Sequence, residues 1–395
     1  MLLLNDQLAA LSESFSIALA DKVRQMKANG TAVIGLQTGD PDFDTPQPII
    51  DAAQKALRDG QTHYTDSRGL PGLRQAIARK IAEQQGVDYD PQSEILVTHG
   101  AIHAYYTGLQ AIIKPGDTVL VPDPSWQTHA NMVRVLRGQA VRVPSLPENN
   151  FFPTFEAWEE SLTPQTVALV INTPNNPTGC MASQAYLQML VEFAERHNLY
   201  IISDEVYERL VYDDNRHISV ASIPGAQERT LLVNSLSKTY AMTGWRVGYL
   251  AAPKQVIDQA LKASQHSITN LAPFIQVGAM TALSSAEVET QVQTMVAAYA
   301  RRRQQVLDIY ADYPEAPVGV VAPQGAFYFF MDVRRLNQPS AVLANRLLDE
   351  ARVALVPGAA YGQAGEGFLR MTIAASDDEV EQGFLTFLQW VGQLR

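Results

Sequence analysis

The chain has 395 residues, with 30 basic and 41 acidic side chains and a formal net charge of −11 at pH 7. This balance argues against a nucleic-acid partner, because contacts to phosphate need a basic surface. The length exceeds that of one typical hydrophobic core, so two domains are expected.

The sequence carries no pattern of export or membrane insertion. Cys180 is the only cysteine, which excludes an intrachain disulfide and suits a reducing compartment. Residues 1–4 are apolar, but the chain turns polar at Asn5 and Asp6 without a basic leader, so no signal peptide is expected. No apolar run reaches the roughly 18 residues of a membrane span. We therefore expect a cytoplasmic protein without a membrane partner.

Between about residues 47 and 285, short apolar runs alternate with helical patterns. The runs are rich in Val, Ile and Leu with little alternation, which is typical of strands covered on both faces. The expected strands are Ile95–Thr98, Thr118–Val121, Val167–Asn172, Tyr200–Ser203, Leu231–Asn234 and Trp245–Ala251. The expected helices are Ile49–Leu57, Leu73–Gln85, Ile102–Ile113 and Gln184–His197. This alternation predicts an α/β domain with a mostly parallel sheet.

The C-terminal part has a different order of elements. The expected helices are Val292–Tyr310, Ala341–Ala351 and Asp378–Leu394, and the expected strands are Gly325–Met331 and Phe368–Ile373. We therefore expect an N-terminal segment at residues 1–46, a large domain at 47–285 and a small α+β domain at 286–395, which the N-terminal segment joins. The basic run Arg301-Arg302-Arg303 falls on the long helix and is expected on its solvated face.

The stretch from Ser235 to Tyr249 places a lysine among small hydroxylated residues. Lys238 follows an apolar run, and Arg246 comes eight positions later. A lysine that forms a Schiff base must lose its proton easily, which burial near other cations promotes. Ser235, Ser237 and Arg246 could hold an anion of the same ligand. Pyridoxal phosphate requires such an amine and anion clamp, although a lysine in this setting can also simply face water.

Two other strand ends carry groups that suit the same ligand, since ligands of open α/β sheets bind at the carboxyl ends of strands. Gly100 lies where a strand passes into a helix, and the amides of Ala101 and Ile102 could bind phosphate there. Trp126 follows a proline-rich loop and could stack on a planar ring. A plain turn and a core tryptophan are the alternatives.

The next two strand ends add polar groups for a pyridine ring. Asn176, in the rigid segment Thr173–Gly179, could donate to a phenolate oxygen, or could belong to an Asx or proline turn. Asp204 could pair with a protonated pyridine nitrogen, or could cap a helix. Tyr207 could hydrogen-bond the ring oxygen, and His129 could support Asp204.

In this order, the motifs resemble class I/II aminotransferases, the aspartate-aminotransferase-like branch of the fold-type I pyridoxal phosphate enzymes. The likeness runs from Gly39–Pro46 to Phe368–Arg370. It implies a large α/β domain with a mostly parallel central sheet flanked by helices, plus a smaller α+β domain. It also implies transfer of an amino group from an L-amino acid to a 2-oxo acid, through a Lys238 aldimine and pyridoxamine phosphate.

The resemblance assigns roles to individual residues and implies pyridoxal 5′-phosphate as the cofactor, with no metal. Lys238, Asp204 and Tyr207 are implied to be catalytic. The implied cofactor-binding residues are Ala101, Ile102, Trp126, Asn176, Asp204, Tyr207, Ser235, Ser237, Lys238, Arg246 and Tyr64. The implied substrate-binding residues are Gly39, Trp126, Asn176 and Arg370, of which Arg370 would fork onto the α-carboxylate. Tyr64 would reach the partner's site, which implies a homodimer.

One departure from the family bears on the substrate. Dicarboxylic substrates need a second cation, and one bacterial group has a lysine where this chain has Ile102. Ile102 therefore disfavours aspartate as the best substrate, unless an arginine of the partner chain substitutes. Tyr105, Tyr106, Phe15 and Tyr328 could line a more apolar pocket, whereas Tyr361 and Phe327 suit core and pocket equally.

The sequence leaves one alternative function open and disfavours two others. A pyridoxal-phosphate-dependent carbon–sulfur β-lyase would share nearly every cofactor contact. A non-catalytic pyridoxal-phosphate-binding regulator would need a DNA-binding domain, but only about forty residues precede the Gly39 motif. A dehydrogenase is disfavoured because the glycine fingerprint of dinucleotide binding is missing.

Overall fold

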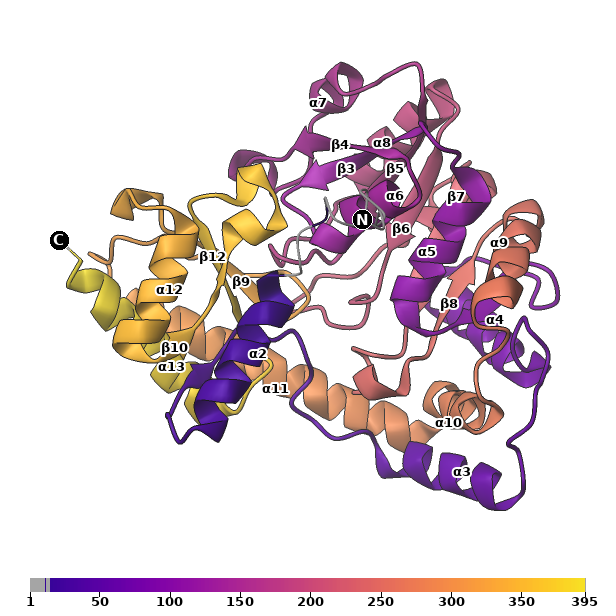
Figure 1. Cartoon of the computed structure of the whole chain (residues 1–395), viewed down its shortest axis with the longest axis horizontal. Coiled ribbons are helices and arrows are strands. Elements are labelled where there is room, and N and C mark those ends of the chain that lie inside the picture. Colours follow the sequence, from indigo (N-terminus) through magenta and orange to yellow (C-terminus); the bar gives the residue numbers. More distant parts are fainter. Residues whose placement is uncertain (1–10, 12–14, 395) are drawn as a thin grey trace, which may run out of the picture.

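The computed structural model describes residue 11 and residues 15–394. Figure 1 shows two regions, one built around a large sheet and the other around the C-terminal strands and helices. The long helix α11 (Ala286–Ala311) runs from beside α10 in the first region to the second. The expectation about a signal peptide concerns residues 1–6, which lie outside the described residues.

The central sheet is mostly parallel, as predicted. In the described residues it has seven strands, in the order β2-β8-β7-β6-β5-β3-β4. Only β8 runs against its neighbours. The strands are β2 (Ile95–Thr98), β3 (Thr118–Asp123), β4 (Gln139–Pro144), β5 (Thr166–Asn172), β6 (Tyr200–Asp204), β7 (Thr230–Ser235) and β8 (Gly248–Ala251).

Helices cover both faces of this sheet. Successive strand residues point to opposite faces, so Leu120 and Leu169 join one core while Val119 and Val170 join another. The helices of this region are α3 (Gln47–Arg58), α4 (Pro71–Gln85), α5 (Gly100–Ile112), α6 (Gln127–Val135), α7 (Phe155–Glu160), α8 (Gln184–Arg196), α9 (Lys254–Ser267) and α10 (Pro273–Ser284). Within the described ranges, no helix combines the length and the apolar composition needed to cross a bilayer.

The second region combines a small antiparallel sheet with helices. Its sheet has the order β11-β12-β9, and a parallel pair, β1 with β10, joins the N-terminal segment to it. Helix α2 lies beside β11. The elements are α2 (Phe15–Ala28), β1 (Ile34–Gly35), β9 (Tyr328–Asp332), α12 (Ser340–Ala351), β10 (Val353–Ala354), β11 (Val356–Pro357), β12 (Phe368–Thr372) and α13 (Asp377–Gly392). The sequence-based domain boundaries stay a prediction.

Two expectations from the sequence are corrected. The strand expected from Trp245 begins only at Gly248, because residues 243–245 form a 3-10 turn and Arg246 has a left-handed φ of 55°. The solvated arginine run is wrong for Arg302 and Arg303, whose side chains are only 7% and 8% exposed. Carboxylates from distant segments pair with them, which makes their burial tolerable; these are Asp42, Asp213 and Asp377.

Candidate active site

A cavity of about 430 Å³ lies where the strands of the central sheet end. Asn172, Asp204 and Ser235, the last residues of β5, β6 and β7, line it. The other predicted site residues that line it are Gly39, Ala101, Ile102, Trp126, Asn176, Tyr207, Ser237, Lys238, Arg246 and Arg370. The only predicted site residue not lining it is Tyr64, which is 88% exposed on the surface. The structure therefore brings the residues predicted at the strand ends together in one cavity, and their roles stay a prediction.

Lys238 offers an amine with an unusually low proton affinity. Its Nζ lies in the cavity, donates to the backbone oxygen of Gly39 at 2.5 Å, and is 5.9 Å from the ring centroid of Phe327. Desolvation lowers the pKa of Lys238 from 10.5 to about 8, against an opposing effect of Asp40 and with help from Arg370 and Arg246. A large fraction of this amine is therefore neutral near pH 8, as a nucleophile or base requires.

Asp204 is fixed by its neighbours. Its Oδ2 lies 2.9 Å from Nε2 of His129, so the predicted contact between these two residues is confirmed. Its Oδ1 accepts from the amide of Val206 at 3.3 Å, and its backbone oxygen accepts from Nδ2 of Asn172 at 2.9 Å. Trp126 meets the His129 ring edge-on, with centroids 5.3 Å apart. The buried carboxylate is thereby held at the cavity wall beside an indole.

Arg370, which also lines the cavity, is preorganised by its contacts. Its Nη1 donates to Oδ1 of Asn176 at 2.9 Å, and its Nη2 donates to the backbone oxygen of Gln37 at 2.6 Å. The guanidinium lies 4.2 Å from the ring centroid of Tyr328 and 5.2 Å from that of Tyr361. Its buried Nε has no partner among the described residues. The contact from Arg370 also leaves Nδ2 of Asn176 as the group that can donate to a ligand.

Two tyrosines that line the cavity contact each other. The hydroxyls of Tyr207 and Tyr328 lie 2.9 Å apart. Burial, followed by the effect of Tyr328, raises the pKa of Tyr207 well above its ordinary value, so this phenol stays protonated and can donate. Gly39 packs so closely here that a Cβ on it would lie 2.0 Å from the Tyr328 hydroxyl oxygen.

The remaining lining groups form an anion cradle. Gly100 opens α5 with a φ of 74°, and a Cβ on it would lie 2.7 Å from Nη2 of Arg246. The hydroxyls of Ser235 and Ser237 lie at the end of β7 nearby, and Arg246 is oriented by donation from Nη1 to the Thr243 oxygen at 2.8 Å. Helix amides, two hydroxyls and a guanidinium suit a phosphate. Together with Lys238, Asp204 and Asn176, this donor set fits pyridoxal phosphate.

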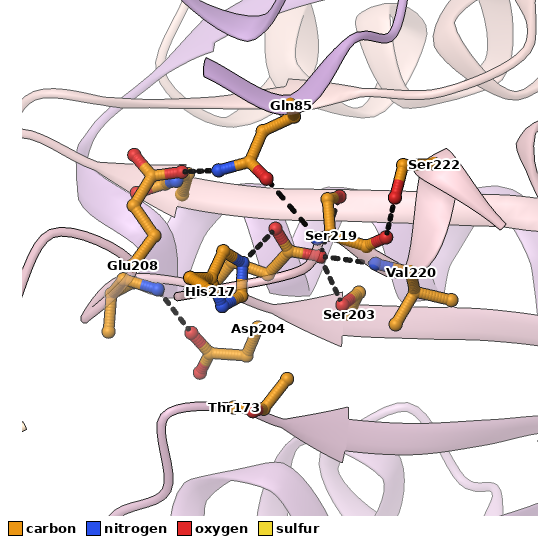
Figure 2. A network of polar contacts seen from close by, with 12 residues as sticks. Gln85, Thr173, Ser203, Asp204, Glu208, His217, Ser219, Val220 and Ser222 are labelled. Carbon is orange, nitrogen blue, oxygen red and sulfur yellow. Dashed lines mark hydrogen bonds and ion pairs between the residues drawn. The ribbon is translucent and has the colours of Figure 1, made fainter. Parts of the chain in front are cut away.

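A buried polar network supports the chain just behind Asp204. The carboxylate of Glu205 is contacted by Ser203, His217, Ser219 and Val220, with His217 Nε2 at 2.8 Å. Figure 2 shows these four residues gathered in one network. Lys80 pairs with Glu208 beside it. Glu205, Glu208 and His217 are close enough to hold a metal ion, but Lys80 already supplies a positive charge there. We interpret the network as a support for the loop that carries Asp204 and Tyr207.

Several lining residues were not singled out as site residues. Tyr328 was expected to line an apolar pocket and does, whereas Tyr105, Tyr106 and Phe15 are not among the lining residues. The Tyr105 hydroxyl instead donates to the His129 oxygen at 3.0 Å, behind the wall. Tyr361, which suited core and pocket equally, also lines the cavity. The lining residues not predicted are Ile17, Ala20, Arg24, Gln37, Thr38, Asn172, Val206 and Thr243. Gln37 and Thr38 could have been found because they directly precede the Gly39 motif. The lining residues of α2, which are Ile17, Ala20 and Arg24, belong to no motif that would have indicated them.

Comparisons with known proteins agree with this geometry. A family model described as aminotransferase class I and II matches residues 31–386. The chain is 40% identical to an aspartate aminotransferase of Pyrococcus abyssi, over 94% of this chain and 96% of that protein. It is 38% identical to aromatic-amino-acid aminotransferase 2 of Thermococcus litoralis, over the same shares. The structure of an aspartate aminotransferase of Thermus thermophilus with maleate superposes with a TM-score of 0.93 at 36% identity, covering 98% of this chain and all of that one.

Proposed function

The chain belongs to the class I and II aminotransferases, and from that premise we propose that Lys238, Asp204 and Arg370 carry out its reaction. The protein is a pyridoxal-phosphate-dependent aminotransferase that moves an amino group from an L-amino acid to a 2-oxo acid. When bound, the cofactor supplies an electron sink that stabilises the negative charge at the substrate's Cα. The protein's own groups bind, orient and move protons.

Lys238 is the base in this proposal. Its Nζ would hold the cofactor, and the free amine would take the proton from the substrate's Cα. The pKa of about 8 leaves the amine able both to accept and to give a proton near neutral pH. Asp204, oriented by His129, would keep the pyridine nitrogen of the cofactor protonated. Asn176 and Tyr207 would donate to the ring oxygen.

The other lining groups hold the two ligands in place. The phosphate of the cofactor would be held by Arg246, Ser235, Ser237 and the amides of Ala101 and Ile102, and Trp126 would lie against its ring. Arg370 binds the α-carboxylate of the substrate through its fork of donors, with Gly39 and Asn176 beside it. The observation that carries the proposal is the convergence of a low-pKa amine, a fixed carboxylate and two arginines on one cavity.

The test is the variant Lys238→Ala. It should lose turnover with every amino donor while remaining folded, and normal turnover would remove Lys238 from the reaction. The carbon–sulfur β-lyase alternative is not favoured by the comparisons. Cystathionine, incubated without an added 2-oxo acid, should yield no pyruvate or ammonia.

We further propose that the preferred amino donor has an apolar or aromatic side chain. Ile102, Ile17, Tyr328 and Tyr361 line the cavity and present mostly apolar surface to a substrate side chain, and the further cation of the lining, Arg24, is paired with Asp21. A half-reaction panel, in which the holoenzyme meets each amino acid in turn and the cofactor absorbance is followed, tests this. A preference for aspartate and glutamate over aromatic or aliphatic donors would overturn it.

For the assembly, we propose a cytoplasmic homodimer with a segment at 1–46, a large domain at 47–285 and a small domain at 286–395. Tyr64 is 88% exposed, so its hydroxyl is available to a second subunit's phosphate site. Light scattering would give the mass of a dimer. Loss of cofactor affinity in Tyr64→Phe would support the contact, and an unchanged affinity would contradict it.

A further inference from the structure

One face of helix α2 (Phe15–Ala28) lines the active-site cavity. Ile17, Ala20 and Arg24 are three and four residues apart, a spacing that puts them on one side of a helix. Leu19 and Val23 are buried and pack into the core with β11 residues. The helix is therefore anchored by one face and presents the other, with a single cation on it, to the site.

Arg24 is the cation in the cavity lining to which the proposed function assigns no role. Among the described lining residues the cations are Arg24, Lys238, Arg246 and Arg370. Lys238 serves as the amine, Arg246 binds the phosphate and Arg370 binds the α-carboxylate. These three residues contact the cofactor and the α-carboxylate, so the substrate's side chain is the part of the ligand without a charged partner.

The present partner of Arg24 is easily exchanged. Its guanidinium pairs with Asp21 on the same helix, and the two side chains are 75% and 58% exposed. Exposed ion pairs of this kind contribute little free energy, so a ligand carboxylate can replace Asp21 at small cost. Ile17 and Ile102, which line the same cavity, are exposed and apolar, and the flat faces of the guanidinium tolerate apolar neighbours.

We propose that Arg24 binds the distal carboxylate of dicarboxylic substrates and so determines specificity for them. This inference rests on the proposed function and deepens it. Apolar donors would leave Arg24 with Asp21, whereas dicarboxylic amino and 2-oxo acids would draw it into the cavity as a second charged clamp. Arg24 thereby takes the part that Ile102 cannot play, and it does so from this chain rather than from a partner chain.

The test compares the holoenzyme with its Arg24→Leu variant. Rapid-mixing half-reactions with aspartate, glutamate and 2-oxoglutarate should slow about tenfold or more, as expected for a lost hydrogen bond to a charged group. Half-reactions with phenylalanine and leucine should change by less than about twofold, since those side chains make no ion pair. Maleate, titrated calorimetrically into the holoenzyme, should bind about tenfold more weakly.

Two further variants separate specificity from helix packing. Lys22→Leu is the matched control, because Lys22 lies on the same helix, pairs with Asp349 at 3.7 Å and does not line the cavity. This variant should leave the half-reaction rates with all substrates unchanged. Asp21→Asn removes the competing carboxylate and should tighten maleate binding, a gain that a misfolded variant cannot give.

The inference would be overturned if Arg24→Leu slowed the half-reactions of all substrates equally, or did not slow those of dicarboxylic substrates. Unchanged or weaker maleate binding in Asp21→Asn would count against the exchange with Asp21. Failure of the proposed function would look different, because the unmodified enzyme would then transfer no amino group from any donor.

Discussion

Lys238 shows how one residue's environment sets its chemistry. Desolvation in the cavity lowers the pKa of its amine to about 8. The neutral amine attacks an aldehyde and the protonated amine does not, so capture of pyridoxal phosphate by the apoenzyme should accelerate with rising pH, with a midpoint near 8. Stopped-flow absorbance across this range measures it. A midpoint at the ordinary lysine value would show that the cavity does not desolvate this amine.

Arg370 should be irreplaceable by lysine. Its fork reaches Asn176 and Gln37 at once while its face lies on Tyr328, which a single ammonium cannot reproduce. Arg370→Lys should lower kcat/KM by about a hundredfold for every amino donor, since misplacement of the α-carboxylate affects all of them. Steady-state kinetics measure the loss. Arg335→Lys, outside the cavity, is the control, and comparable losses in both variants would contradict a special role for Arg370.

At the level of elements, the junction of β2 and α5 depends on Gly100. Its φ is left-handed, and a Cβ at this position would lie only 2.7 Å from Nη2 of Arg246, so both features exclude a side chain. Gly100→Ala should therefore displace Arg246 and weaken cofactor binding about tenfold or more, as the loss of a charge-assisted contact would. Equilibrium titration of the apoenzyme measures this. Gly392→Ala, which has open space around it, should bind normally; equal affinity in the two variants would refute the cradle.

The elements of the large sheet were predictable because their residues are uniformly apolar. Ile95–Thr98 is strand β2 without a shift, and the strand ends at Asn172, Asp204 and Ser235 put the site where parallel strands terminate. β4 was missed, since most of its residues remain partly exposed and Gln139–Pro144 gives no apolar run. The strand expected from Trp245 starts late because Arg246 turns left-handed to reach the cradle.

Contacts between distant segments lie beyond what a pattern can give. Arg302 can be buried because it pairs with Asp42 and Asp377, which lie far from it in the chain. No local feature of the arginine run indicates these pairs. The cavity face of α2 could not be predicted for the same reason. Ile17 and Arg24 belong to no motif, and they line the cavity only because of the elements that α2 packs against.

For the whole molecule, the buried pair of Lys80 and Glu208 ties α4 to the loop behind β6. The two side chains are only 7% and 4% exposed. Lys80→Met would leave a buried carboxylate unpaired and should lower the free energy of unfolding by about 3–5 kcal/mol. Denaturant unfolding of the cofactor-saturated protein measures this.

The double variant Lys80→Met with Glu208→Leu should recover most of that loss, because no charge is then left unpaired. Lys55→Met, which breaks an exposed pair with Asp59, should cost no more than about 1 kcal/mol. A similar cost for Lys55→Met and Lys80→Met would mean that the buried pair adds nothing beyond a surface one.

The proposed reaction depends on which lysine nitrogen holds the cofactor. Protein saturated with pyridoxal phosphate, reduced with borohydride and digested, can be read by mass spectrometry residue by residue. We expect the phosphopyridoxyl mass on the peptide that contains Lys238, and on no other lysine. An unmodified Lys238, or the label on a different lysine, would contradict the proposed role of Lys238.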